Sequence, residues 1–208
     1  MNQLIGINLI EPGAVLGDNN IIGPFVVIME NVVIGDSNTI GPGTVIGTPP
    51  QHTHRGEING TVVIGNNNTI REHVTIHAAL EPEHVTSIGN NCYIMAGTHI
   101  GHDCVIEDGV ILAAPKLAGF TRVMTRANVG LGSITHQFTT IGSGAMVGCG
   151  SVVVKDIPPY RKVVGNPVRD IGENAYVSSG ISDEDKEAEN ERFHQIRNEE
   201  KRGNRILQ

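Results

Sequence analysis

One aliphatic residue recurs every six positions along most of this chain, and this period limits the folds that are open to it. The first run comprises Leu16, Ile22, Ile28, Ile34, Ile40 and Ile46, and glycine follows five of these residues. A period of six matches neither the 3.6-residue turn of an α-helix nor the two-residue alternation of a strand. Each unit is therefore interpreted as one short strand followed by one corner.

The same period continues after each interruption. It returns at Ile64, again at Ile88, and, after one residue is dropped near Pro115, at Leu117 and onward to Val153. Three such units make a triangular coil whose inward aliphatics stack on those of the next coil. The 26 glycines and the absence of tryptophan agree with many turns between short strands. We therefore predict an all-β solenoid.

Two segments break the period, near residues 48–61 and 77–87, and must leave the coil as surface loops. Such loops either contain functional residues or are tolerated insertions without a role. The histidines of the first loop favour a functional role. Pro158, Pro159 and Pro167 are expected to end the repeat, because proline donates no backbone N–H. Ser182 and the acidic residues after it predict a helix from about Asp183 to Arg202. The chain then divides into a β-helix over residues 1–172 and a short C-terminal helical tail over residues 173–208.

Charge and composition narrow the class of function. The 15 Lys and Arg against 22 Asp and Glu give a formal charge of -7, which offers no basic face for nucleic acid or for a membrane surface. The chain has no apolar run of about 20 residues and no basic leader, so we expect no membrane span and a cytoplasmic enzyme. The cysteines form no CxxC pair and are interpreted as small buried apolar residues: Cys92, Cys104 and Cys149.

Histidines are the strongest candidates for chemistry. His99 and His102 flank Ile100, so their rings are expected on the outer surface if Ile100 points inward. His102 with the adjacent Asp103 could act as a general base, although neighbours in a strand point to opposite faces and need not touch. A surface or packing role for His102 stays open. Together with Cys104 the two histidines could also bind zinc, but no second cluster has a matching interval, and we expect no metal.

Five segments resemble the UDP-N-acetylglucosamine O-acyltransferases of lipid A biosynthesis: residues 70–77 (IREHVTIH), 99–106 (HIGHDCVI), 111–119 (ILAAPKLAG), 134–138 (ITHQF) and 141–160, which holds IGSGAMVG and DIPPY. The resemblance implies a left-handed parallel β-helix and a homotrimer with active sites between subunits. It also implies that His102 deprotonates a sugar hydroxyl that attacks a thioester, and that the Gly119 N–H stabilises the oxyanion. The sugar site would include His99, His136 and Gln51.

The chain also departs from this family. Phe120 stands where the family has a sugar-contacting histidine, and His52 and His54 replace charged residues of the first loop. We expect His52, His54 and Asn174 to be substrate-binding residues. The departures predict retained chemistry with altered sugar or nucleotide contacts.

The segment VVGNPVRDIG resembles coenzyme A-dependent hexapeptide acetyltransferases. By this resemblance the acyl donor is expected near Cys149, Asn166, Pro167 and Arg169. The leading hypothesis is an acyltransferase that uses acyl carrier protein or acyl-CoA as co-substrate, with no bound cofactor, in the biosynthesis of lipopolysaccharide or another surface polysaccharide. The alternatives are an acetyl-CoA-dependent N-acetyltransferase of a nucleotide-linked amino sugar, a γ-carbonic-anhydrase-like zinc protein and a non-catalytic β-helix.

Overall fold

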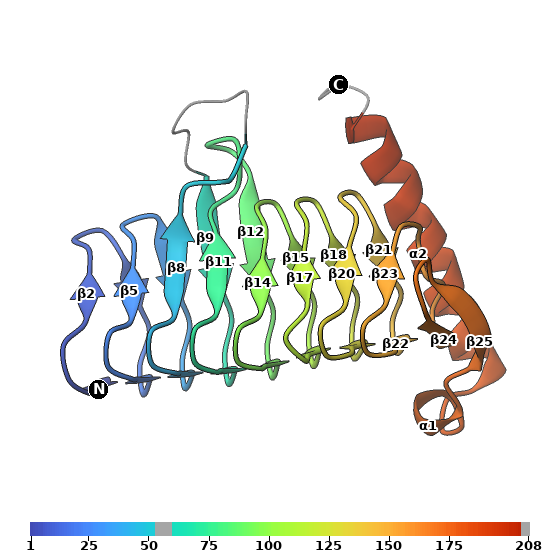
Figure 1. Cartoon of the computed structure of the whole chain (residues 1–208), viewed down its shortest axis with the longest axis horizontal. Coiled ribbons are helices and arrows are strands. Elements are labelled where there is room, and N and C mark those ends of the chain that lie inside the picture. The colour runs from blue at the N-terminus through green and yellow to red at the C-terminus, as the bar shows by residue number, and fades with distance from the viewer. Residues whose placement is uncertain (53–59, 205–208) are drawn as a thin grey trace.

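The computed structural model describes residues 1–52 and 60–204, and side chains up to residue 200. Short strands stack into three sheets that form the walls of one continuous coil (Figure 1). The predicted unit of one strand and one corner is therefore confirmed. The fold is a left-handed parallel β-helix, as the resemblance implied.

We name the three walls by their strand numbers. The ten-stranded face contains β1 (Gln3–Leu4), β4 (Ile21–Ile22), β7 (Thr39–Ile40), β10 (Thr69–Ile70), β13 (Tyr93–Ile94), β16 (Ile111–Leu112), β19 (Asn128–Val129), β22 (Met146–Val147), β24 (Arg161–Val164) and β25 (Arg169–Glu173). The eight-stranded face contains β2 (Leu9–Ile10), β5 (Val27–Ile28), β8 (Val45–Thr48), β11 (Thr75–His77), β14 (His99–Ile100), β17 (Lys116–Leu117), β20 (Ile134–Thr135) and β23 (Val152–Val153). The seven-stranded face contains β3 (Val15–Leu16), β6 (Val32–Ile34), β9 (Thr61–Ile64), β12 (Val85–Ile88), β15 (Val105–Ile106), β18 (Arg122–Val123) and β21 (Thr140–Ile141).

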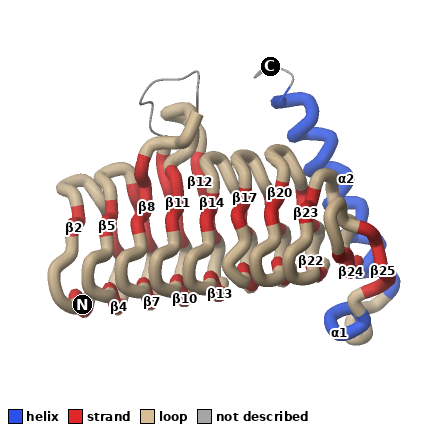
Figure 2. Tube along the Cα trace, in the orientation of Figure 1, coloured by secondary structure: helices blue, strands red, loops and turns tan. Residues whose placement is uncertain are grey.

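The periodic aliphatic residues form the core. The strands of one wall lie side by side along the coil (Figure 2). Ile76 pairs with Ile100, and Ile100 pairs with Leu117, 17 residues on, which absorbs the residue dropped near Pro115. These side chains are fully buried. Each such burial stabilises the fold by about 1.5–3 kcal/mol before the loss of conformational entropy.

Both insertions leave the coil at one edge, which we call the loop edge: the corners between the eight-stranded and seven-stranded faces (Figure 1). The first lies between β8, which ends at Thr48, and β9, which begins at Thr61. The second is shorter than predicted, because residues 85–87 already pair with β9 as part of β12. The two insertions thus occupy the same corner of neighbouring coils.

The C-terminal end closes the coil. The prediction that the prolines end the repeat is only partly right, since β24 still pairs in parallel with β22 and only β25 turns back antiparallel. The helices α1 (Ala175–Ser178) and α2 (Asp183–Asn204) follow, and the Ser182 hydroxyl accepts the Asp185 N–H at the start of α2. None of the described helices is long and apolar enough to cross a membrane.

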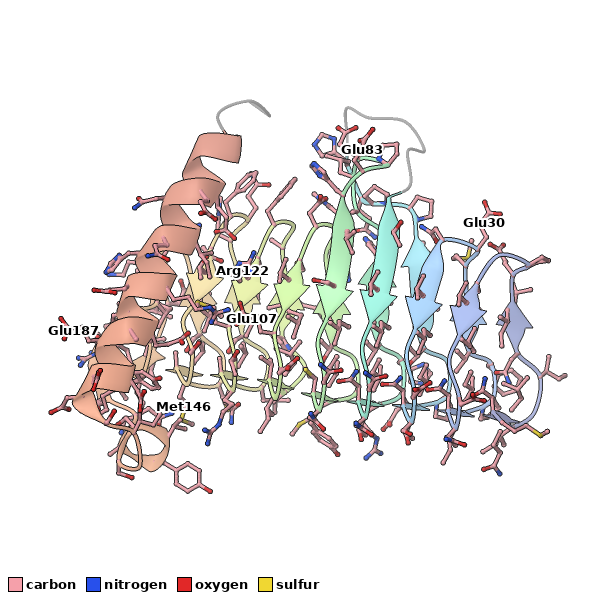
Figure 3. The ribbon with its side chains drawn as sticks, turned by 180° about the vertical axis from the view of Figure 1, so that it is seen from behind. Glu30, Glu83, Glu107, Arg122, Met146 and Glu187 are labelled. Carbon is pink, nitrogen blue, oxygen red and sulfur yellow. The ribbon has the colours of Figure 1, made fainter. Side chains whose placement is uncertain are left out.

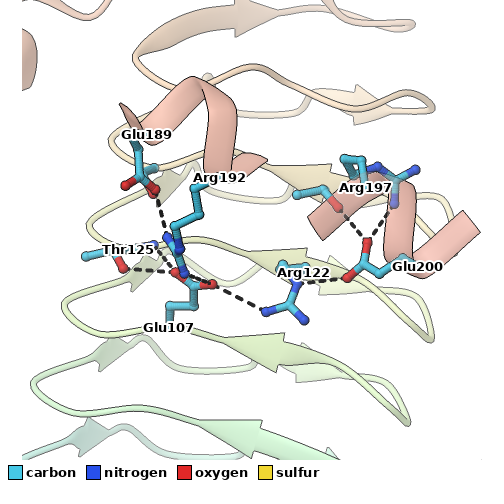
Figure 4. Close-up of polar contacts among 9 residues, drawn as sticks. Glu107, Arg122, Thr125, Glu189, Arg192, Arg197 and Glu200 are labelled. Carbon is cyan, nitrogen blue, oxygen red and sulfur yellow. Dashed lines mark hydrogen bonds and ion pairs between the residues drawn. The ribbon is translucent and has the colours of Figure 1, made fainter. Parts of the chain in front are cut away.

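Helix α2 lies across the seven-stranded face and is held there by an ionic network (Figures 3 and 4). Glu107 accepts hydrogen bonds from Arg192 at 2.7 Å and Arg122 at 3.3 Å, and Glu200 pairs with Arg122 at 2.8 Å. Phe193 is the buried apolar contact. Burial raises the pKa of Glu107, but hydrogen bonds from Arg192 and Thr125 outweigh this effect and leave the pKa below its ordinary value.

Replacing Glu107 by glutamine is expected to loosen helix α2, because two guanidinium groups lose their ionised acceptor. The free energy of unfolding should fall by about 1.5–3 kcal/mol, the range for a hydrogen bond to a charged group. Since the folded pKa is depressed, wild type should lose the same stabilisation as the pH falls below 4.5, and Glu107→Gln should lose less. Amide hydrogen exchange of α2 measures the effect. Glu187→Gln, on the exposed side of α2, is the matched control, and equal protection in all three proteins would contradict the role of the network.

Candidate functional site

His102 lies at the loop edge, two residues after the inward-facing Ile100 of β14. Sequence reasoning placed its ring on the outer surface, but only 8% of the residue is exposed. The reason is the next coil, where the Phe120 ring packs edge-to-face on the imidazole with centroids 5.2 Å apart. His102 is thus held in a largely dry corner.

Asp103 is directed at His102, although adjacent strand residues point to opposite faces. Its backbone has φ 57°, so it occupies a left-handed corner where the alternation rule does not apply. The His102 Nδ1 lies 2.8 Å from Asp103 Oδ2, the Leu80 N–H donates to the same oxygen at 2.9 Å, and the Asp103 N–H donates to Thr86 Oγ1. The contact that the sequence left open is therefore present.

The charge state of Asp103 fixes the tautomer of His102. Burial raises the pKa of Asp103, but hydrogen bonds from His102, the Leu80 N–H and His84 together bring it below its ordinary value. An ionised carboxylate only accepts hydrogen bonds, so Nδ1 of His102 is the donor. In a neutral ring the free lone pair is then on Nε2, which is the atom a general base needs.

Gly119 lies directly against the imidazole, one coil further on. The Phe120 N–H donates to the His102 carbonyl at 3.0 Å, which brings the two corners together. A Cβ on Gly119 would lie 2.5 Å from both Nε2 and Cε1 of His102, so only glycine leaves the ring its place. Within the described part of the chain, no acceptor takes the Gly119 N–H.

Two further histidines lie beside this corner. His99 Nδ1 is 2.8 Å from Thr75 Oγ1, and its ring packs edge-to-face on His77 at 4.8 Å. Burial, followed by the neighbouring His99 and His102, lowers the pKa of His77 to about 4. Burial, Lys116 and His102 lower that of His99. Both rings are therefore neutral near pH 7 and can offer hydrogen bonds without charge.

Further aromatic and polar side chains lie along the loop edge. Phe138 stacks on Phe120 with centroids 4.6 Å apart, and we call this pair the aromatic wall. The ring of His52 lies 6.2 Å from that of His102, and the exposed His136 follows β20 at the same edge. Five of the predicted site residues thus lie at or beside the loop edge: His52, His99, His102, Gly119 and His136. Gln51, which precedes His52, is exposed. His54 lies outside the described residues.

The remaining predicted residues lie elsewhere. The buried Asn174 donates through Nδ2 to the Gly144 carbonyl at 2.9 Å, so its side chain holds the end of the coil. The residues expected at the acyl donor are exposed near the edge between the ten-stranded and eight-stranded faces: Cys149, Asn166, Pro167 and Arg169. Their binding roles, and that of Asn174, stay predictions.

The structure shows which cysteines are buried and how the possible metal ligands are arranged. Cys92 and Cys104 are buried as predicted, whereas Cys149 is exposed. The Cys104 thiol donates to the Ala118 carbonyl at 3.2 Å. Among the described residues, no group of three or more His, Cys, Asp and Glu side chains is arranged to hold a metal ion.

Sequence reasoning missed His84, which lies in the second insertion. Its Nδ1 is 2.7 Å from Asp103 Oδ1, on the side of the carboxylate away from His102. The available signal was a histidine within an insertion that returns to the corner of His102, but no spacing rule predicts this contact.

The described repeat agrees with a family model, bacterial transferase hexapeptide (six repeats), which matches residues 13–48 and 86–115. An acyl-[acyl-carrier-protein]–UDP-N-acetylglucosamine O-acyltransferase of Sinorhizobium fredii is 40% identical over 180 residues, which cover 77% of this chain and 67% of the relative. The chain belongs to the family of UDP-N-acetylglucosamine O-acyltransferases.

Other members differ in length from this chain. The relative of the same name from Gloeothece citriformis is 44% identical over 128 residues, 61% of this chain but only 46% of the relative. The chain thus spans about half the length of this curated relative. The solved UDP-N-acetylglucosamine acyltransferase of Campylobacter jejuni superposes with a TM-score of 0.81 at 28% identity, covering 93% of this chain and 78% of that one. LpxA of Bacteroides fragilis gives 0.73 at 33% identity, with coverages of 91% and 82%.

Proposed function

We propose that this protein transfers an acyl group from a thioester donor to a hydroxyl or amine of a nucleotide-activated sugar. The observation that carries the proposal is the geometry around His102. Its Nδ1 donates to ionised Asp103, its Nε2 has no hydrogen-bond partner among the described residues, and Gly119 lies against that nitrogen. UDP-N-acetylglucosamine is the first acceptor to test, because it stands in the names of the relatives.

The reaction follows from these positions. His102 Nε2 takes the proton of the acceptor hydroxyl as its oxygen attacks the thioester carbonyl. A tetrahedral oxyanion forms, and the Gly119 N–H, which has no described acceptor within the chain, stabilises it. Collapse breaks the carbon–sulfur bond, and the thiolate takes the proton back from His102. Asp103 stabilises the imidazolium that exists between the two transfers.

We propose a homotrimer with the acyl donor between subunits. The predicted donor residues and His102 lie at different edges of one coil, so one subunit alone does not bring them together. A neighbouring copy could present its own donor edge to the loop edge. Acyl carrier protein is the favoured donor because it stands in the names of the relatives. We also propose that the reaction takes place in the cytoplasm.

The donor and acceptor classes are separated by mass spectrometry of the product. Acyl-carrier-protein thioesters with UDP-N-acetylglucosamine should give a nucleotide sugar heavier by the acyl group. Acetyl-CoA with a nucleotide-linked amino sugar is the second pair, favoured by the exposed turn of Asn166 and Pro167. Transfer by neither pair would overturn the proposal.

Replacing Phe120 by histidine is expected to raise kcat/KM for UDP-N-acetylglucosamine. Phe120 offers no hydrogen bond to a sugar beside His102, whereas an imidazole there could donate one. One such bond corresponds to about tenfold in kcat/KM. Phe120→Leu, which offers no donor, is the control. An equal effect of both variants would show that position 120 contributes packing and no hydrogen bond to the sugar.

A further inference from the structure

The carboxylate of Asp103 is bonded on both oxygens, and the two sides come from different parts of the chain. Oδ2 accepts His102 Nδ1 and the Leu80 N–H, whereas Oδ1 lies 2.7 Å from His84 Nδ1. The Asp103 side chain is only 6% exposed and that of His84 is 38% exposed. His84 thus joins a buried carboxylate to the surface of the loop edge.

The second insertion holds His84 in this place. The His84 N–H donates to the Glu81 carbonyl at 2.9 Å, and the His84 carbonyl accepts the Thr61 N–H of β9 at 3.1 Å. The backbone of the residue is therefore tied to its own loop and to the neighbouring coil. Because ionised Asp103 only accepts, the Nδ1 of His84 donates, and it does so in either charge state of the ring.

We propose that His84 is a positioning residue for His102 and acts through Asp103, an inference that rests on the proposed function. Its N–H satisfies Oδ1 and fixes the rotation of the carboxylate, so that Oδ2 stays aligned with His102 Nδ1. Without it, a buried oxygen loses its partner and the carboxylate can turn. The His102 ring would then lose the orientation that directs Nε2 past Gly119.

The charges around His84 give the expected direction of the pH effect. Asp103 contacts its ring, while Glu83 lies exposed in the same loop and Glu81 is part of the turn. The hydrogen bond from His84 lowers the pKa of Asp103, so removing the donor raises that pKa and protonates the carboxylate at higher pH. The acidic limb of the kcat/KM profile should move to higher pH.

His84→Ala is expected to lower kcat by about tenfold, within the range seen when a supporting hydrogen bond to a functional side chain is lost. Both KM values should stay as in wild type. His84→Asn should restore kcat and the pH profile, because its Nδ2 occupies the place of Nδ1. Glu83→Ala, at an exposed position of the same loop, is the control. A loss of kcat in His84→Ala that His84→Asn does not rescue would overturn the proposal.

A measurement independent of turnover separates this inference from the proposed function. Nitrogen-15 NMR of the histidine rings should show His102 protonated on Nδ1 in wild type and in His84→Asn. In His84→Ala that proton should exchange with water faster. If wild type transfers no acyl group but this pattern appears, the proposed function fails and the positioning role stands; unchanged exchange in His84→Ala refutes the role whether or not the enzyme is active.

Discussion

Replacing His102 by asparagine is expected to reduce kcat by about 10²- to 10⁴-fold, the contribution of one positioned general base. Asparagine is the informative replacement because its Nδ2 can keep the hydrogen bond to Asp103, whereas nothing replaces Nε2. Initial rates of acyl transfer, together with binding of the nucleotide sugar, measure the effect.

Binding should remain close to that of wild type, since the lost nitrogen acts on the proton and the asparagine fills part of the space. Because His102 is buried, the melting temperature of the variant shows whether its fold is intact. His136→Asn, an exposed residue further along the loop edge, should lose far less kcat. Full activity of His102→Asn would refute the assignment of the base.

Gly119→Ala is expected to lower kcat by about 10²-fold or more, the effect of moving a catalytic group by about 1 Å. The added Cβ would lie 2.5 Å from His102 Nε2, which is closer than a Cβ approaches a non-bonded atom. The imidazole must therefore move from its position against Asp103. The backbone of Gly119 is not in the left-handed region, so alanine adds no backbone strain, and the three atoms nearest to the added Cβ all belong to His102.

The stability of Gly119→Ala separates a displaced base from a damaged coil. We expect a small change in melting temperature beside the large loss of kcat, because the Cβ meets the end of a side chain rather than the backbone of the coil. Gly180→Ala is the matched control, since a Cβ there meets no atom within 4 Å. A Gly119→Ala variant with wild-type kcat would show that the ring tolerates displacement and would remove Gly119 from the site.

The architecture could be predicted because one local rule is repeated. Inward residues such as Ile76, Ile100 and Leu117 stack on one another, so their period gives strands, corners and core together. The insertions could be placed on the surface for the same reason. That both reach one edge follows from their positions: each follows a strand of the eight-stranded face.

The contacts of the site could not be predicted in the same way. Whether Asp103 meets His102 depends on a left-handed corner, which the residue type does not announce. The burial of His102 depends on Phe120, 18 positions later, and the second partner of Asp103 comes from an insertion without a period. These contacts are set by how neighbouring coils stack. The family resemblance located His102 and Gly119, but His84 lies at a position that the resemblance did not cover.

We expect the loop edge to bind the acceptor sugar with its reactive group at His102. A crystal structure with UDP-N-acetylglucosamine tests it most directly. The predicted result is one hydroxyl or amine of the sugar within hydrogen-bond distance of His102 Nε2, next to Gly119 and the aromatic wall, with the nucleotide along the same edge. A sugar bound away from His102, with Nε2 facing no acceptor group, would contradict it.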